Sequence, residues 1–211
     1  MPCKEVLKHG IEQVMKKHSK RRALRCAVVC LLLLTACSGA SQGPPGNVEN
    51  ACLIKKDRPQ WFRAMERTQA RWGVPVHVQL ATFYQESTFR PTARPPRKKV
   101  LGFIPAGHIT SAYGYAQAID GTWDWYRTET GKRRAKRDRF PDASDFVGWY
   151  MAKATQDIGI APNDAYAHYL AYHEGHAGYR RGSYQRKAWL QNTAARVQAR
   201  ASRYRDQLRS C

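Results

Sequence analysis

The chain has 211 residues, of which 36 are Lys or Arg and 16 are Asp or Glu, so its formal net charge is +20 at pH 7. A positive field of this size attracts polyanions, although part of the excess also serves general solubility. After an N-terminal segment of distinct composition, roughly 150 residues remain, which is enough for one hydrophobic core and excludes several large domains.

The first part of the chain, residues 1–36, has the composition of a targeting segment. Basic side chains are frequent between residues 16 and 25, and the apolar run 26–34 follows them. This run is shorter than the roughly 20 apolar residues of a membrane-spanning helix. The next residues, Leu-Thr-Ala-Cys at 34–37, resemble a bacterial lipobox, in which the chain is cut before the cysteine and lipid is attached to its sulfur. The alternative is an ordinary secretory signal with an incidental cysteine.

Two further expectations concern this end of the chain. Met15 is followed directly by basic residues, so residues 1–14 are interpreted as an over-extended start. Ser38 after the modified Cys37 is similar to lipoproteins that reach the outer membrane of diderm bacteria. The expected location is therefore the cell envelope, with a lipid anchor in the outer membrane and the protein facing the periplasm. Nucleic acid, which an exported protein rarely meets, is not an expected partner.

Few cysteines remain in a processed chain. Once Cys37 carries lipid, Cys52 and Cys211 are the two thiols left, near the two ends of the processed chain. Export to an oxidising compartment favours a disulfide between them over two free thiols. Closing so long a loop stabilises a fold by up to about 5 kcal/mol in the chain-entropy model.

The rest of the chain divides into a spacer and a helical domain. Ser, Gly, Pro and Asn are frequent before residue 51 and no apolar periodicity is visible, so residues 37–57 are predicted to form a flexible tether. Residues 58–211 carry apolar side chains at helical spacing, most clearly from Leu190 to Leu208. Strand signals are confined to a short hairpin expected within residues 100–113, so the predicted fold is mainly α.

One carboxylate occupies a position suited to acid chemistry. Glu86 comes at the end of the apolar run 76–83. An acid at such a place is poorly solvated, and burial raises its pKa toward the range of a proton donor at neutral pH. Taken alone, a Glu-Ser pair at a helix end is more often a cap or a surface acid, so this residue needs support from elsewhere in the chain.

Three segments supply that support. They are Glu-Ser-Thr-Phe-Arg-Pro-Thr-Ala at 86–93, Ser-Ala-Tyr-Gly-Tyr-Ala-Gln at 111–117 and Ala-Tyr-His-Glu-Gly at 171–175. In this order they resemble the lytic transglycosylases of the soluble-lytic-transglycosylase (SLT) type, in the lysozyme-like superfamily. That family shows the motifs E-S-x-F-x-P-x-A, G-L-M-Q and A-Y-N-A-G. The resemblance covers roughly residues 60–180.

The three motifs match to different degrees. The first agrees at every fixed position. The second keeps Gly114 and Gln117 but has Tyr-Ala in the middle, and the third has His173 and Glu174 where the family has Asn-Ala. A basic insertion separates the first two motifs. The altered third motif leaves open a catalytically silent lipoprotein that binds peptidoglycan.

The resemblance implies a lysozyme-like (SLT or goose-type) helical domain with a catalytic cleft, acting as a monomer on peptidoglycan glycan strands. Glu86 would be the single acid and base that cleaves the β-1,4 bond between N-acetylmuramic acid and N-acetylglucosamine, leaving a 1,6-anhydro end. No cofactor and no metal are expected. The residues implied in substrate binding are Ser87, Gly114, Tyr115, Gln117, Tyr172, His173 and Glu174.

Several of these residues have more specific expected roles. Ser87 would hydrogen-bond the carboxyl group of Glu86 or an N-acetyl group, and Gln117 would both donate to and accept from a sugar amide. Tyr172 would orient Glu86 through its hydroxyl group, as its counterpart is thought to do in the family. Gly114 would allow a tight bend of the backbone beside the saccharide.

Two other activities remain open. A lysozyme-like hydrolase would use the same Glu86 with an anchored water and a base such as Glu174 or Asp120. A lytic subunit of a secretion machine would carry the same domain. The histidines around the third motif do not have the spacing of the metalloprotease pattern, so a zinc site is not favoured.

Overall fold

The computed structural model describes residues 43–101 and 103–211. The residues described from 43 onward belong to one compact unit with its own hydrophobic core. The expectations for residues 1–36, the start site and Cys37 lie outside the described residues. None of the helices in the described ranges combines the length and the apolar character needed to cross a bilayer.

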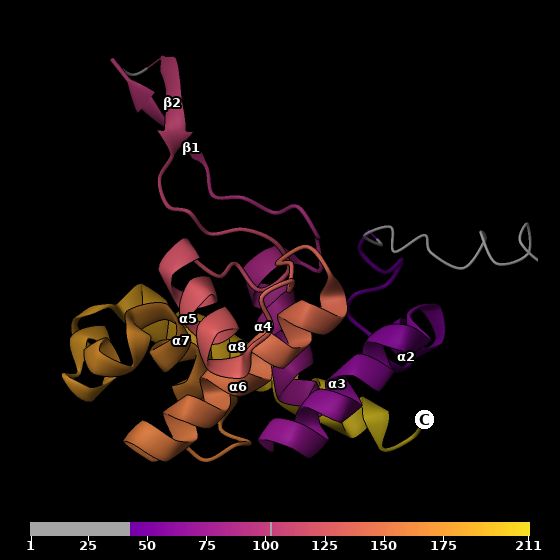
Figure 1. Cartoon of the computed structure of the whole chain (residues 1–211). Coiled ribbons are helices and arrows are strands. Elements are labelled where there is room, and N and C mark those ends of the chain that lie inside the picture. Colours follow the sequence, from indigo (N-terminus) through magenta and orange to yellow (C-terminus); the bar gives the residue numbers. More distant parts are fainter. Residues whose placement is uncertain (1–42, 102) are drawn as a thin grey trace, which may run out of the picture. The chain divides into compact units, whose positions relative to one another are not determined.

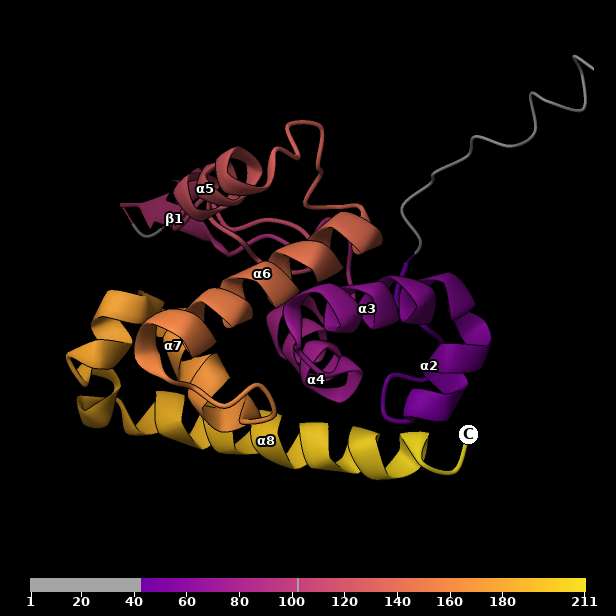
Figure 2. The same cartoon turned by 60° about the horizontal axis from the view of Figure 1, so that its bottom comes forward.

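The described unit is mainly helical, as predicted, with one small hairpin (Figures 1 and 2). In chain order its elements are α2 (Ala51–Asp57), α3 (Pro59–Trp72), α4 (Val76–Ser87), β1 (Arg97–Val100), β2 (Ile104–His108), α5 (Asp120–Thr130), α6 (Phe140–Ile158), α7 (Ala165–Arg180), the 3₁₀ turn η2 (Ser183–Arg186) and α8 (Ala188–Leu208).

Helix α4 lies at the centre of the unit. It packs against α3, α6, α7 and α8, and its side chains Val78, Leu80 and Phe83 have no exposed surface. The continuous apolar run of the sequence is therefore a helix buried on nearly all sides. An aromatic stack fixes its C-terminal half, since the ring centroid of Phe140 lies 4.1 Å from that of Trp61 and 4.8 Å from that of Phe83.

The expected spacer is shorter than predicted. Residues 51–57 form α2, whose first turn is capped by the side chain of Asn50, and Ala51 and Ile54 are fully buried. The prediction of a flexible tether is wrong for this segment because its two apolar side chains are buried where α2 packs against α3 and α8. Both of these helices lie outside the predicted tether. Cys52 and Cys211 form a disulfide that joins α2 to the end of the chain.

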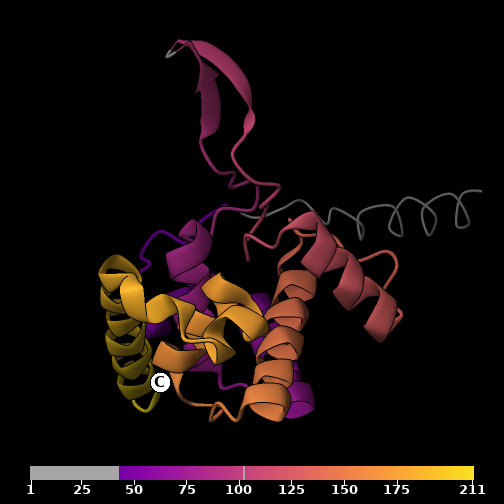
Figure 3. The same ribbon diagram turned by 90° about the vertical axis from the view of Figure 1, so that its left-hand side faces the viewer.

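The β1–β2 hairpin projects from the helical body (Figures 1 and 3). Its strands are antiparallel, with Arg97 opposite His108 and Val100 opposite Ile104. The hairpin expected within residues 100–113 is thus present, but its first strand begins earlier, in the basic insertion.

Candidate active site

The first motif lies at the C-terminal end of the buried helix α4. Glu86 occupies the last turn, and the chain then reverses through two left-handed residues, Thr88 (φ 50°) and Phe89 (φ 59°). Phe89 has no exposed surface, and its ring stacks on Trp61 with centroids 5.9 Å apart. The turn is therefore held by the core, directly after the helical turn that carries Glu86.

Burial dominates the electrostatics of Glu86. The residue keeps part of its surface accessible to solvent, while protein atoms pack densely around its carboxyl group. This desolvation raises the pKa of Glu86 to about 8, and a hydrogen bond from the hydroxyl group of Tyr169 opposes the rise without cancelling it. At neutral pH the group is mostly protonated, as a general acid must be.

Two tyrosines on α7 surround this carboxyl group, three residues apart and so on the same face of the helix. Tyr169 is hydrogen-bonded to Glu86. The pKa of Tyr169 is raised, mainly by burial and to a smaller extent by the charge of Glu86. Tyr172 donates its hydroxyl hydrogen to the carbonyl oxygen of Ala116 at 2.6 Å. The hydroxyl hydrogen bond to Glu86 expected of Tyr172 is thus made by Tyr169. The pKa of Tyr172 is raised by burial and then by the charge of Glu86, which lies close to it, so a role of Tyr172 beside Glu86 stays a prediction. Sequence reasoning missed Tyr169, although its i, i+3 spacing from Tyr172 was a usable signal.

Ser87 points into the protein rather than toward a ligand. It is 2% exposed, and its hydroxyl group donates to the carbonyl oxygens of Tyr115 (2.8 Å) and Phe83 (3.2 Å). The expected hydrogen bond with the carboxyl group of Glu86 is not made, and the place of Ser87 on the buried side of α4 argues against a contact with an N-acetyl group. Its observed role is to tie the end of α4 to the second motif.

The second motif forms a tight loop beside the C-terminal end of α4. Gly114 has φ of 81°, and a Cβ atom there would lie 2.2 Å from the carbonyl oxygen of Arg137, so no side chain fits. Gln117 donates its amide hydrogens to the carbonyl oxygens of Ala93 and Gly114, each at 2.9 Å. The expected donation from this amide to a sugar is thus replaced by bonds that hold the first and second motifs together.

Tyr115 also differs from the expectation of a substrate-binding side chain. It has no exposed surface, and its ring meets the edges of Trp61 (5.5 Å) and Phe140 (5.2 Å) between centroids. Hydrogen bonds from Ser87 to the carbonyl oxygen of Tyr115 and from Gln117 to that of Gly114 hold the backbone here. The ring of Tyr115 accordingly packs into the core.

The third motif contains the second carboxylate of the region. The side chain of Glu174 is 4% exposed and receives hydrogen bonds from Lys187 (2.7 Å), the hydroxyl group of Ser183 and His173 (3.0 Å). The bond from Lys187, then that from Ser183, lower the pKa of Glu174 to about 2, so it is ionised at neutral pH. These side chains cover it from solvent, which argues against the expected contact with substrate.

A comparison with protein families now adds to this geometry. The family model described as the transglycosylase SLT domain matches residues 25–211. The chain belongs to this family. A search of curated proteins found no match. Membership supports a lytic transglycosylase acting on peptidoglycan, with a lysozyme-like domain, and the match extends beyond the segment that carries the three motifs.

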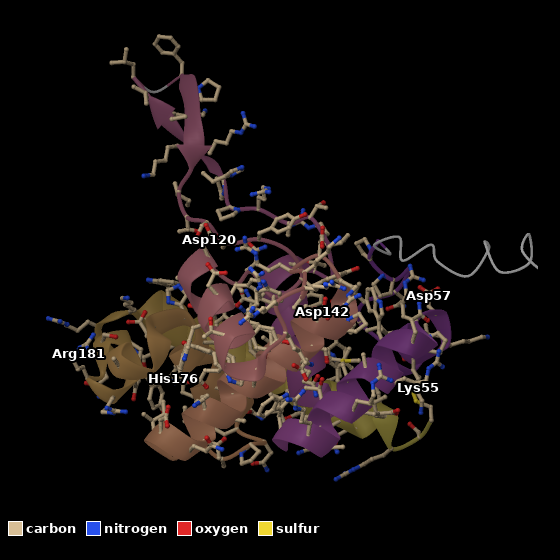
Figure 4. The ribbon with its side chains drawn as sticks, in the orientation of Figure 1. Lys55, Asp57, Asp120, Asp142, His176 and Arg181 are labelled. Atoms are coloured by element: carbon tan, nitrogen blue, oxygen red, sulfur yellow. A yellow bond between two sulfur atoms is a disulfide. The ribbon has the colours of Figure 1, made fainter. Side chains whose placement is uncertain are left out.

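The remaining predicted residues of this SLT domain lie at its surface. His173 has a side chain that is 39% exposed, and its ring lies 5.1 Å from that of the exposed Trp189. Asp120, labelled in Figure 4, begins α5, and its carboxyl group pairs with Arg137 at 2.7 Å. His173 remains a predicted substrate contact, whereas Asp120 is an exposed member of an ion pair at some remove from the buried helix α4.

The histidines of this SLT domain do not gather around an ion. His168 is buried, and burial lowers its pKa to about 4, so it is neutral at pH 7. His176, labelled in Figure 4, packs against the ring of Tyr150 at 4.4 Å. Within residues 43–101 and 103–211, no three His, Cys, Asp or Glu side chains are grouped so that they could hold a metal.

Proposed function

We propose that this SLT domain cleaves the β-1,4 bond between N-acetylmuramic acid and N-acetylglucosamine of peptidoglycan, with Glu86 as the single acid and base. The observation that carries the proposal is the buried carboxyl group at the end of α4, whose pKa is raised to about 8. A protonated acid at neutral pH is what the first step of glycosidic cleavage requires.

The reaction proceeds in two proton transfers. Protonated Glu86 gives its proton to the glycosidic oxygen, and the bond to the anomeric carbon breaks while the 2-acetamido group of the muramic sugar stabilises the developing positive charge. Glu86 then takes the proton of the C6 hydroxyl group of the same sugar. That oxygen closes on the anomeric carbon and leaves a 1,6-anhydro end. Each general acid or base step contributes about 10²–10⁴-fold to the rate.

Tyr169 stabilises the form of Glu86 that exists between the two proton transfers. Its hydroxyl group donates to Glu86, and such a bond favours the ionised carboxylate. The carboxylate formed after the first transfer is therefore stabilised until it acts as a base. Because the hydroxyl group is held in a buried site, it also limits the orientations available to the carboxyl group.

The surroundings of the other carboxylates favour transglycosylation over hydrolysis. A hydrolase needs a second carboxylate as base or nucleophile. Glu174 is held by Lys187, and Asp120 is held by Arg137 at the start of α5. Neither is hydrogen-bonded to Glu86 or to Tyr169 in the described residues. The muramic sugar itself then supplies the attacking oxygen.

Digestion of purified sacculi tests this proposal. The parent protein is expected to release products one water lighter than hydrolysed muropeptides, and the Glu86→Gln variant is expected to release none while binding sacculi as the parent does. Products of hydrolysed mass would identify a muramidase instead. Binding of sacculi by the parent without release would identify a silent peptidoglycan-binding protein.

We also propose that the protein is exported as a monomeric lipoprotein, anchored through Cys37 in the outer membrane and facing the periplasm. The disulfide between Cys52 and Cys211 supports export, since such bonds persist in oxidising compartments. The mass of the protein purified from membranes should include a lipid at Cys37 and rise by two hydrogens on reduction. An unmodified Cys37 would contradict the proposed lipid anchor, and an unchanged mass on reduction would contradict the disulfide.

A further inference from the structure

The tip of the β1–β2 hairpin exposes large apolar side chains. Val100, Leu101 and Phe103 are 51%, 78% and 75% exposed. They stand together at the end of an element that projects from the helical body (Figures 1 and 3), whereas the other exposed large apolar residues are spread over several helices and loops. Adjacent apolar side chains held away from the core indicate a surface that meets a partner.

The strand behind this tip is cationic. Arg97, Lys98 and Lys99 precede Val100 on β1 and are all exposed. The sequence contains no Asp or Glu between Ser87 and Ile119. In the described part of the chain, none of the three cations takes part in an ion pair. The hairpin therefore presents an apolar end behind which positive charge is not neutralised.

A second cationic segment adjoins the base of the hairpin. The loop 131–139 carries six Lys or Arg residues against one Asp. Its Arg137 donates to the carbonyl oxygens of Ser111 (3.1 Å) and Ala118 (2.8 Å), in the segment that returns from the hairpin. The same loop lines a surface hollow of about 510 Å³, to which Arg133 and Arg134 contribute. Lys132, Arg137 and Arg139 of this loop pair with Asp145, Asp120 and Asp142, so among the described residues the loop cations outside any ion pair are Arg133, Arg134 and Lys136.

We infer that the β1–β2 hairpin docks on an anionic lipid bilayer, with the side chains of Leu101 and Phe103 entering the interface and the cations of β1 facing the headgroups. The cations of loop 131–139, at the base of the hairpin, add to the positive field that attracts such a surface. An apolar tip above a cationic collar matches the two layers of such a surface. A soluble polyanion would engage the cations but would gain nothing from the exposed Leu and Phe. The contact is separate from the lipid proposed at Cys37 and does not depend on the proposed cleavage of glycan.

The unit 41–211, which has its own core and lacks the N-terminal apolar run, is suited to the test. It should sediment with vesicles of phosphatidylglycerol and phosphatidylcholine, and much less with phosphatidylcholine alone. The double variant Leu101→Ser/Phe103→Ser should bind the anionic vesicles at least about tenfold more weakly, because it removes the apolar side chains that enter the interface. Lys98→Glu/Lys99→Glu should show a loss of similar size.

Matched controls change the same kinds of side chain elsewhere. Leu53→Ser removes an apolar side chain that is 46% exposed on α2, and Arg63→Glu/Arg67→Glu reverses two exposed cations on α3. The affinity of both variants for vesicles should stay within about twofold of that of the parent. The loss of a single contact between a cation and the headgroups would change the affinity by more than this. Thermal unfolding midpoints of all variants should agree with that of the parent, since none of these side chains belongs to the core.

Three results would overturn the inference. The first is a parent unit that does not bind anionic vesicles. The second is a tip variant that binds them as the parent does, which would leave only a polyanion site. The third is a parent that self-associates through the tip without binding lipid. Cleavage of soluble glycan fragments should be unchanged in the tip variant, so this test and that of the proposed function can fail separately.

Discussion

Glu86 and Glu174 are carboxylates of two neighbouring regions with opposite chemistry. Glu86, at the end of the buried helix α4, has one neutral hydroxyl partner and a pKa raised to about 8 by burial. Glu174, in the third motif on α7, has Lys187 as partner and a pKa lowered to about 2. Protein atoms pack far more densely around Glu86 than around Glu174, so the difference teaches that burial beside a neutral partner keeps the proton on an acid, whereas a cationic partner removes it.

The largest expected effect is the difference in the rate of glycan cleavage between variants that lack one or the other carboxylate. Glu86→Gln should lower the rate of glycan cleavage by at least about 10³-fold, because it removes both proton transfers. Glu174→Gln should leave the rate within about tenfold at a temperature where the variant is folded, since only the ion pair with Lys187 is lost. Product release from sacculi measures both. Equal losses in the two variants would mean that the reaction uses two carboxylates.

The pH dependence of stability should separate the two groups next. The folded chain binds the proton of Glu86 more tightly than the unfolded chain, so its contribution is fully present below pH 4.5 and is lost as the pH rises to about 8. Glu174 acts in the opposite sense, with a contribution present above pH 4.5 and lost as the pH falls toward 2.

Glu86→Gln, which resembles the protonated acid, should therefore be more stable than the parent at pH 8–9, on the order of a few kcal/mol, and equally stable near pH 4. Urea titrations at the two pH values would show it. A parent and a variant that differ by the same amount at both pH values would mean that Glu86 does not titrate in this range.

A smaller loss is expected when Glu174 is deprived of its cation. Lys187→Met keeps most of the aliphatic side chain and leaves Glu174 with Ser183 and His173 as partners. Stability at pH 7 should fall by about 1–2 kcal/mol, less than for a fully buried pair because the side chain of Lys187 is 41% exposed. Cleavage should be little affected, and a loss as large as that of Glu86→Gln would contradict the structural role of Glu174.

The subtlest comparison involves the two tyrosines of α7. Tyr169→Phe removes the hydrogen bond that favours ionised Glu86, so the pKa of Glu86 should rise further and the alkaline limb of the rate profile should move to higher pH. Tyr172→Phe instead leaves the carbonyl oxygen of Ala116 without its donor, at a cost of about 1–3 kcal/mol in stability. If only Tyr172→Phe moved the alkaline limb, the assignment of the two hydroxyl groups would be reversed.

The sequence predicted the features that depend on local pattern. The apolar run before Glu86 indicated a poorly solvated acid, and the structure places that residue at the end of a helix with almost no exposed apolar surface. The helical periodicity from Leu190 to Leu208 corresponds to α8. The helical content and the hairpin followed from the same kind of signal, because each is set by side chains close together in the chain.

Other features depend on contacts between distant segments, and the sequence did not show them. Thr88 and Phe89 take left-handed conformations that non-glycine residues rarely adopt, and Ser87 just before them bonds to the carbonyl oxygen of Tyr115 in the second motif. Helix α2 has only two buried apolar residues, too few for a periodicity, and it is completed by its partners. Tyr169 reaches Glu86 only once α7 packs on α4.

The pKa of Glu86 is the quantity on which the proposed reaction depends most directly. The ¹³C chemical shift of its side-chain carboxyl group, assigned by its absence from the spectrum of Glu86→Gln, can be followed as the pH is raised from 3 to 10. The structure predicts a midpoint near 8, with the acid still mostly protonated at pH 7. A midpoint near the 4.5 of an exposed glutamate would contradict the account, because the carboxyl group would then have no proton to give at neutral pH.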